Sequence, residues 1–181
     1  MRVLFCDQSL LRFGFCIVKI HRDHCEVIAY GLLQLNGKQH YIERLQQIQK
    51  WLAGMIGEYE IDEVVCEEIQ FQRNVQTFRK LAVLQYVIEV TCHSHSICFG
   101  KPLQVHVWRT KGVRRILQLP NGNKQTLFQF LNSYLGSPLY FDTNQADALG
   151  LAIYWCYTNY ESLPLHMQGA AQLLQKGEGI C

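Results

Sequence analysis

Acidic residues stand at three points of the chain where an apolar segment turns polar. Asp7 follows "VLFC", Glu67 follows "VVC", and Asp147 lies within "DTNQADALGLAIYWCY". A carboxylate at the end of a buried strand is costly unless something cationic meets it. Asn144 precedes Asp147 by three positions, so on a helix the two side chains share one face. These four residues are the first candidates for chemistry.

The three carboxylates need positive charge nearby if the fold brings them together. Two like charges about 4 Å apart repel by roughly 4 kcal/mol at an effective dielectric constant near 20. Hard divalent cations that prefer oxygen ligands, namely Mg²⁺ or Mn²⁺, relieve this repulsion. Each acid taken alone is explained as well by solvation or capping, and only their joint pattern favours a metal site.

Basic residues gather in one part of the chain. Between Ile69 and Phe141 the only acidic residue is Glu89, whereas nine basic residues occur there. They are Arg73, Arg79, Lys80, Lys101, Arg109, Lys111, Arg114, Arg115 and Lys124. Because the whole chain has a net charge of only +2, this segregation is typical of a surface that follows a phosphate backbone. A solvated basic face is the alternative interpretation.

The hydrophobic pattern predicts an α/β fold. Residues 2–35 are predicted to form three consecutive antiparallel strands, and Gly14 inside the second indicates a close backbone approach or a bulge. The later elements are a helix over 41–57, a strand over 64–66, a helix over 74–90 capped by Asn74, a strand over 103–107, a basic helix over 108–117, a helix over 124–135, and a helix over 142–157 capped by Asp142 or Thr143. This order fits a mixed sheet with helices on both faces. The helix over 74–90 is apolar nearly all round, so we expect it to be central and buried.

Length and composition indicate a single folded unit. A chain of 181 residues with 49% apolar and 18% charged residues is expected to form one domain over 1–160, followed by a mobile tail over 161–181. No window approaches eighteen uncharged apolar residues, and the acid at position 7 comes too early for a secretory signal. We therefore expect no membrane association.

The eight cysteines indicate a reducing compartment, and so a cytoplasmic protein. Most of them lie in or beside apolar segments, where free thiols pack like small hydrophobic groups. The stretch "CHSHSIC" at 92–98 holds two thiols and two imidazoles, but it lacks the paired short spacings of a structural zinc motif. The plainer interpretation is a helix end that runs into a strand.

Four motifs in register over most of the chain resemble one known family. They are "FCDQSLLRFGFCIV", "RLQQIQKWLAGMIGEYEIDEVVCEE", "CEEIQFQRNVQTFRKLA" and "NQADALGLAIYW". These stretches are similar to the first hairpin, the first helix with the fourth strand, the segment after the catalytic Glu, and the closing helix of the RuvC-type Holliday junction resolvases. The resemblance runs from about Arg2 to Tyr157, with the motifs in the family's order.

The resemblance implies an RNase H-like (retroviral integrase-like) fold with a mixed five-stranded sheet and helices on both faces. It further implies a DNA-associated homodimer that resolves four-way junctions in DNA recombination and repair, with two Mg²⁺ ions per active site or Mn²⁺ in their place. The family's catalytic positions fall on Asp7, Glu67, Asp147 and Lys124, and its metal ligands on Asp7, Glu67, Asn144 and Asp147. Residues expected to contact DNA are Arg12, Phe71, Arg73, Lys111, Arg114, Arg115 and Lys124.

The chain departs from the family pattern at three places. Asn144 stands where the family has an Asp or His metal ligand, and an amide oxygen brings no charge; Asp142 is the alternative fourth ligand. The aromatic residue three positions after the catalytic Glu is Gln70 here, with Phe71 beside it. Gln8 and Ser9 replace the Pro or Gly that is usual in the first turn.

Other functions remain open on the sequence. A related RNase H-fold nuclease acting on other branched or hybrid nucleic acids shares every residue named above. Asn144 also fits a catalytically weakened protein that binds junctions. A sugar-kinase-type ATPase domain has an Asp in its first hairpin as well, but the Gly-rich adenosine motifs and the second domain of that class are missing. The sequence names neither a motor-protein partner nor a preferred cleavage sequence.

Overall fold

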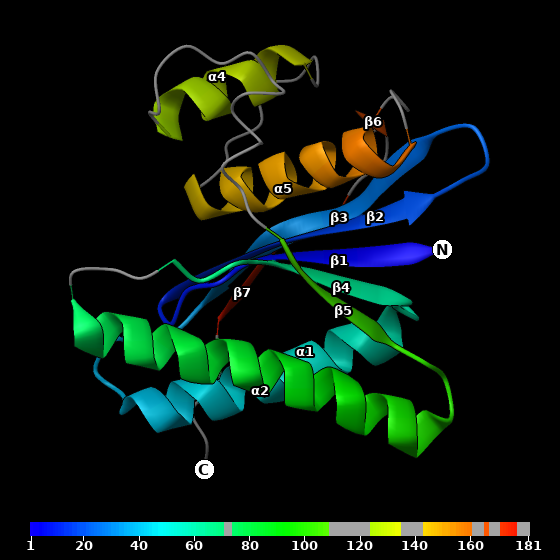
Figure 1. Ribbon diagram of the computed structural model, residues 1–181. Helices are drawn as coiled ribbons and strands as arrows, with labels where there is room; N and C mark the ends of the chain where they lie inside the picture. The colour runs from blue at the N-terminus through cyan, green and yellow to red at the C-terminus, as the bar shows by residue number, and fades with distance from the viewer. Residues whose placement is uncertain (71–73, 109–123, 135–142, 161–164, 167–170, 177–181) are drawn as a thin grey trace.

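The computed structural model describes residues 1–70, 74–108, 124–134, 143–160, 165–166 and 171–176. Figure 1 shows a central twisted sheet between two layers of helices. In chain order the elements are β1 Arg2–Asp7, β2 Arg12–Ile20, β3 Cys25–Gln34, α1 Tyr41–Glu58, β4 Glu63–Glu67, α2 Val75–Phe99, β5 Gln104–Trp108, α4 Lys124–Tyr134, α5 Thr143–Tyr160, β6 Leu165–His166 and β7 Ala171–Lys176.

The sheet confirms the mixed arrangement that the sequence predicts. Its five main strands lie in the order β5-β4-β1-β2-β3. The pairs β1–β2 and β2–β3 are antiparallel, as expected for strands joined by short turns. The pairs β1–β4 and β4–β5 are parallel, with helices α1 and α2 as the crossovers. Parallel strands need such connections, because a short turn cannot return the chain to the same end of the sheet.

Each face of the sheet packs against its own helices, so the expectation of helices on both faces is confirmed. In Figure 1, α1 and α2 cover one face, while α5 covers the other with α4 beyond it. Side chains alternate along β1 accordingly: Val3 and Phe5 belong to the core under α5, whereas Leu4 and Cys6 belong to the core against α1. The Phe5 ring meets Trp155 of α5 edge-on, with centroids 5.6 Å apart.

Helix α1 forms where the spacing of apolar residues predicts a helix. His40 caps it by accepting a hydrogen bond from the Ile42 backbone N–H, and its buried residues recur at helical spacing. Trp51 on this helix packs against both Phe13 and Phe15 of β2, with ring centroids 5.4 and 5.1 Å away. The amphipathic helix predicted over 41–57 is therefore confirmed to within one residue.

Helix α2 differs from the prediction in length and in burial. Its predicted cap is confirmed, since the Asn74 side chain accepts hydrogen bonds from two backbone N–H groups of the first turn. The helix then continues to Phe99, because no glycine or proline interrupts it before Gly100, which closes it at φ 63°. Only Leu84, Ile88, Thr91 and Cys92 are buried. The helix lies in the outer layer, so its apolar surplus faces outward instead of into a core.

The last segment adds strands that the sequence pattern does not predict. Residues 165–166 and 171–176 pair in parallel with β3, at the edge of the sheet farthest from β5. The stretch "AQLLQK" is short and weakly patterned. Its pairing partner lies more than 130 residues earlier in the chain, so local sequence does not reveal it.

Most of the cysteines are packed as the sequence indicates. Within the described residues seven cysteines are free and six of them are buried, with Cys98 the exposed one. Burial, followed by the charge of Glu89, raises the pKa of Cys92 to about 12. That thiol is thus neutral at physiological pH and packs as a small apolar group. No helix among the described residues is long and apolar enough to cross a membrane.

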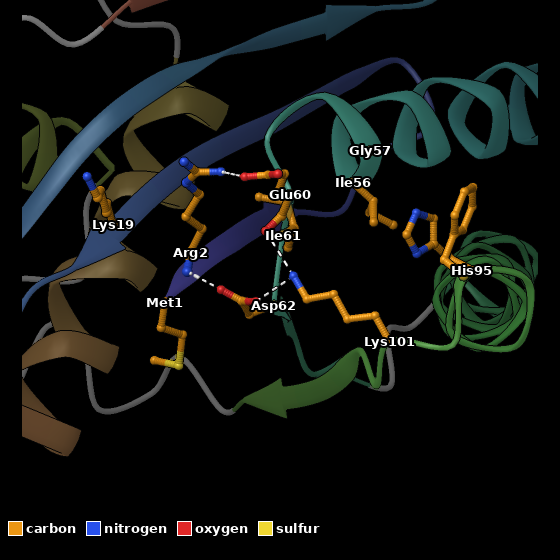
Figure 2. A pocket seen from close by; sticks show the side chains of 11 residues that line it. Met1, Arg2, Lys19, Ile56, Gly57, Glu60, Ile61, Asp62, His95 and Lys101 are labelled. Atoms are coloured by element: carbon orange, nitrogen blue, oxygen red, sulfur yellow. Dashed lines mark hydrogen bonds and ion pairs between the residues drawn. The ribbon is translucent and has the colours of Figure 1, made fainter.

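A small network of charges fastens the start of β1 to its neighbours. The Arg2 backbone N–H donates to the Asp62 carboxylate at 2.7 Å, and Lys101 pairs with the same carboxylate at 2.6 Å. The Arg2 guanidinium pairs with Glu60 at 2.5 Å (Figure 2). The network joins β1, the turn before β4 and the segment that leads into β5.

Asp62 should contribute stability that depends on pH. Burial alone raises its pKa, but hydrogen bonds from Lys101 and the Arg2 N–H, together with the charges of Lys101 and the N-terminal amine, hold the pKa below its usual value. A lowered native pKa stabilises the fold above the unfolded-state pKa of about 4, and this contribution disappears as the pH falls through the native pKa. We expect Asp62→Asn to cost about 1 kcal/mol at pH 7 and much less at pH 3. Thermal unfolding at both pH values measures the difference, and a loss that does not change with pH would contradict it.

Candidate active site

Two of the candidate acids lie side by side at one end of the sheet. The parallel strands β1 and β4 pair Cys6 with Cys66, so the next residues, Asp7 and Glu67, leave the two strands at the same edge. Phe5 and Val65 belong to the core under α5. Two residues further along each strand, Asp7 and Glu67 therefore point to that same face. Both residues are half-buried.

Helix α5 begins directly over this end of the sheet. Gly14 of β2 pairs with Asp7 in the antiparallel register. A Cβ atom at residue 14 would lie 2.6 Å from the carbonyl carbon of Asn144 and closer still to its oxygen. The Asn144 side chain Nδ2 donates to the Arg12 carbonyl oxygen at 2.5 Å. The close backbone approach that Gly14 predicts is therefore confirmed, and its partner is the first turn of α5.

Asp147 lies one turn further along the same helix. It is half-buried, whereas Ala146 and Ala148 on either side are almost fully buried in the core. The amino end of α5 points toward this edge of the sheet, and the partial positive charge of a helix amino end favours carboxylates there. Acids from β1, β4 and α5 thus come to one region of the surface.

The first turn of the chain is held by polar side chains. Ser9 Oγ accepts hydrogen bonds from the backbone N–H groups of Leu11 and Arg12, at 3.3 and 3.2 Å. Gln8 Nε2 donates to the backbone oxygen of Glu67 at 2.8 Å. Gln8 Oε1 is buried and has no hydrogen-bond partner among the described residues. The two residues that depart from the family's usual Pro or Gly therefore shape the turn and connect it to β4.

The donor set fits a hard divalent cation. Asp7, Glu67 and Asp147 offer carboxylate oxygens, and Asn144 offers an amide oxygen. Among the described residues, no three His, Cys, Asp or Glu side chains are close enough to form a ready-made metal cage. Like charges repel one another, so carboxylates in one site turn apart unless cations lie between them.

Comparison with known protein families shows which family the chain belongs to. The family model of the crossover junction endodeoxyribonuclease RuvC matches residues 3–154. The chain belongs to the RuvC family. A RuvC protein of Brachyspira hyodysenteriae is 26% identical over 154 residues, which cover 84% of this chain and 92% of that protein. A second RuvC protein, of Alkaliphilus metalliredigens, is 33% identical over 111 residues, 58% of this chain.

Solved structures of RuvC and of another Holliday junction resolvase share the fold. Thermus thermophilus RuvC in complex with Holliday junction substrate superposes with a TM-score of 0.70 at 16% identity, over 89% of this chain and 97% of that one. The yeast mitochondrial Holliday junction resolvase Ydc2 gives 0.60 at 11% identity, over 84% of this chain and 76% of that one. The sheet order and the two helix layers are those of the RNase H-like fold of RuvC. Membership of this nuclease family also implies use of a divalent metal.

Several residues assigned from the RuvC resemblance fall outside the described structure. They are Phe71, Arg73, Lys111, Arg114, Arg115 and the alternative ligand Asp142. Lys124 is the first residue of α4. Arg12 is exposed at the start of β2, beside the turn that leads from Asp7. The described structure shows where the acids lie, whereas their role as metal ligands and the basic residues expected to face DNA remain predictions.

The residues of "CHSHSIC" do not gather into a second metal site. Cys92 is buried in the core against α1, while His93 and Cys98 are exposed on other sides of α2. His95 stacks on Phe99 of the same helix, with ring centroids 4.4 Å apart. The stretch forms the last two turns of α2, which ends at Phe99 and is followed by strand β5, so its interpretation as a helix end that leads into a strand is confirmed.

A hollow of about 600 Å³ lies at the other end of the sheet from the acids. Arg2, Asp62 and Lys101 line it (Figure 2), and the charges of all three are paired there. Arg2 is the first residue of β1, whereas Asp7 is the last. This hollow is therefore separate from the RuvC acids.

Gly14→Ala should disrupt the site from within the sheet. The added methyl group meets the Asn144 backbone, so either α5 shifts away from Asp7 or the fold loses about 1–3 kcal/mol. We expect nuclease activity to fall by at least tenfold under conditions where the variant is folded.

Activity and thermal unfolding are measured together with Gly54→Ala, whose added methyl group meets nothing within 4 Å. That control lies inside α1 and should be neutral or stabilising by up to about 1 kcal/mol. Wild-type activity in Gly14→Ala would contradict the assignment.

Proposed function

We propose that this chain is a structure-selective endonuclease that resolves four-way DNA junctions by metal-dependent hydrolysis. The observation that supports this most directly is the meeting of acids from three elements at one end of the sheet. Asp7 and Glu67 leave adjacent parallel strands on the face covered by α5, and the Gly14 contact sets Asn144 and Asp147 over them. This arrangement, in a member of the RuvC family, favours phosphodiester cleavage.

The proposed metal ligands are Asp7, Glu67, Asp147 and Asn144. Two Mg²⁺ ions held there, or Mn²⁺ in their place, would activate a water molecule and stabilise the leaving 3′ oxygen. Asp7 lies on β1, between β4, which carries Glu67, and β2, which α5 approaches at Gly14. We therefore propose that Asp7 would help to hold both ions. Glu67 approaches from β4, and Asp147 with Asn144 approaches from α5. Lys124, at the start of α4, is proposed to neutralise the scissile phosphate.

DNA recognition is proposed to come from the basic segment and from the turn after β1. Arg12 is exposed next to the acids, where its guanidinium can neutralise a phosphate. The segment from Arg73 to Lys124 holds most of the remaining basic residues. Phosphate contacts of this kind supply affinity without sequence preference, which suits an enzyme that selects a branched shape. Phe71 is proposed to contact bases near the crossover.

We propose that the protein acts as a homodimer through α2. A junction needs two symmetric cuts, and a twofold dimer supplies two sites. The outward face of α2 carries exposed apolar side chains, among them Tyr86 at 66% and Ile97 at 69% exposure. Apolar side chains grouped on one helix are typical of a protein–protein contact.

A DNA-associated role in the cytoplasm is part of the proposal. The free, mostly buried cysteines support it, because thiols persist in a reducing compartment.

One observation favours a second candidate, a junction-binding protein with weakened cleavage. Asn144 donates through Nδ2 to the Arg12 carbonyl, so its amide is used structurally and adds no charge to the metal site. Cleavage that requires Mn²⁺ or millimolar Mg²⁺, with tight junction binding throughout, would favour this candidate over an efficient resolvase. Cleavage of flaps or RNA–DNA hybrids in preference to junctions would favour a related nuclease instead.

Asp7→Asn should abolish cleavage and leave junction binding intact. The variant loses the charge that both ions share but keeps the shape of the side chain. Replacing even an outer partner of a metal ligand costs about 10–100-fold, so we expect a loss of at least 100-fold. The assay uses a synthetic four-way junction with and without Mg²⁺, maps the cuts, and measures binding by gel shift in EDTA.

The control for this experiment is Asp23→Asn. It removes the same charge from an exposed aspartate at the turn between β2 and β3, and it should cleave like the wild type. Full activity in Asp7→Asn would overturn the site assignment. Inactive wild-type protein at every Mg²⁺ and Mn²⁺ concentration would overturn the proposed activity.

Tyr86→Glu should convert the dimer to a monomer. A charge placed in an apolar contact weakens association by more than tenfold, or about 1.4 kcal/mol. Size-exclusion chromatography with light scattering measures the mass, and paired cuts in the junction should give way to single nicks. Tyr157→Glu is the matched control, because it changes an exposed tyrosine on α5 instead. A wild-type protein that is monomeric, or a variant that stays dimeric, contradicts the α2 interface.

A further inference from the structure

Helices α1 and α2 both begin at the end of the sheet where the acids lie. Figure 1 shows the first turns of both helices at the end of the sheet where β1 finishes, on the face away from α5. The turn after Asp7 is attached to α1 there, because Arg44 Nη1 donates a hydrogen bond to the Leu10 backbone oxygen at 3.2 Å. The Leu35 backbone N–H also donates to the Leu11 oxygen at 2.9 Å. The start of α1 is therefore next to the turn that leads from the acidic strand end.

Arg44 holds a positive charge that no described carboxylate neutralises. Its side chain is half-buried, and it forms no ion pair among the described residues. Its Nε donor is buried and has no hydrogen-bond partner in that part of the chain. A partly buried charge without a counter-ion costs the fold stability unless an anion meets it. The oxygens of a phosphate match a guanidinium well, because they accept its N–H groups as a planar pair.

A lysine of α2 lies over the same part of α1. Lys80 Nζ is 5.5 Å from the centroid of the Tyr41 ring, and this cation–π contact restrains an otherwise flexible side chain. Tyr41 and Arg44 are three residues apart on α1, so their side chains share one helical face. Lys80 is exposed and forms no ion pair within the described residues. Two cations from different helices therefore belong to one surface.

Few acids oppose these two cations. The first half of α2, over residues 75–88, contains Arg79 and Lys80 and no acid. The first half of α1, over residues 41–49, contains one acid, Glu43. Duplex DNA carries about one negative charge per 1.7 Å of its axis, and the acids of the proposed site repel it. Cations beside the acids would therefore stabilise an arm of a junction that reaches the site.

We propose that Arg44 and Lys80 form a second DNA-contact surface, on the α1 and α2 side of the active-site end, which binds phosphates of a junction arm. This inference rests on the proposed function, because it takes four-way DNA as the ligand. It extends the DNA-facing surface from the basic segment after β4 to α1, which the sequence pattern did not include. Because the contacts are to phosphates, they add affinity without base preference.

Binding of a synthetic four-way junction in EDTA tests this surface without cleavage. Fluorescence anisotropy measures the association constant from about 50 to about 200 mM salt. The variants are Arg44→Gln, Lys80→Gln and the double variant, with Arg44→Lys to restore the charge. Lys50→Gln is the matched control, because it removes the same charge from an exposed residue further along α1. Thermal unfolding in EDTA shows whether each variant is folded.

The salt dependence of binding distinguishes a phosphate contact from a structural role. Each phosphate contact adds about 0.9 to the steepness with which the logarithm of the association constant falls against the logarithm of salt concentration. We expect Arg44→Gln and Lys80→Gln each to bind more weakly than the wild type and to lower this slope by about 0.9, and the double variant to lower it by about 1.8. Arg44→Lys and Lys50→Gln should keep the wild-type slope.

An unchanged slope in either Arg44→Gln or Lys80→Gln would overturn the proposed surface. Weaker binding with the wild-type slope would overturn it too, because that is the result expected if Arg44 only supports the turn at Leu10. An equal fall of the slope in Lys50→Gln would assign the effect to net charge instead of to this surface, and the proposal would again be wrong.

The same measurements separate this inference from the proposed function. If the wild type binds the junction and both neutralised variants bind it equally well, the surface is wrong and the proposed function stands. If the wild type does not bind four-way junctions, both are wrong. Should Arg44→Gln not fold, Lys80→Gln and Lys80→Glu decide the question, because Lys80 is exposed and reversing its charge should lower the slope further than neutralising it.

Discussion

The candidate site depends on how closely α5 approaches the sheet at Gly14. The backbone of Asn144 lies against the Cα atom of this residue, with no room for a side chain. Gly14 pairs with Asp7 across the hairpin, so the same contact that seats the helix also brings its polar first turn over the acidic strand end. Asp147 lies one helical turn beyond this contact, so the contact also sets where that acid stands relative to Asp7.

The charged side chains at the two ends of β1 are arranged in opposite ways: opposite charges pair at one end, and like charges gather at the other. At its start, Arg2 and Lys101 meet Glu60 and Asp62 in ion pairs that join neighbouring elements. At its other end, three elements bring carboxylates of the same sign to one region. Proteins retain such groupings where cations are bound, since the charges are otherwise costly to hold together. The first arrangement serves stability, and the second is the one that we propose for metal-dependent chemistry.

Amide side chains connect the site to the fold. Asn144 Nδ2 donates to the Arg12 carbonyl, and Gln8 Nε2 donates to the Glu67 carbonyl. A carboxylate at residue 144 would set two acceptors against each other at the Arg12 contact. The departure from the family's charged ligand therefore matches the local packing of α5 on β2. In both residues the amide nitrogen connects the candidate site to a neighbouring strand.

The sequence by itself determined the elements, the residue types of the site and the family resemblance. Apolar residues that recur every two positions indicate strands, and those that recur every three to four positions indicate helices. Gly14 indicated a close backbone approach but not which segment makes it. Only the tertiary structure decided that α2 leaves Tyr86 and Ile97 exposed, that residues 171–176 pair with β3, and that Gln8 reaches Glu67. The physical reason is that a local sequence pattern shows which positions of an element are buried. The segment that covers a face or accepts a hydrogen bond comes from a distant part of the chain, so the local pattern does not identify it.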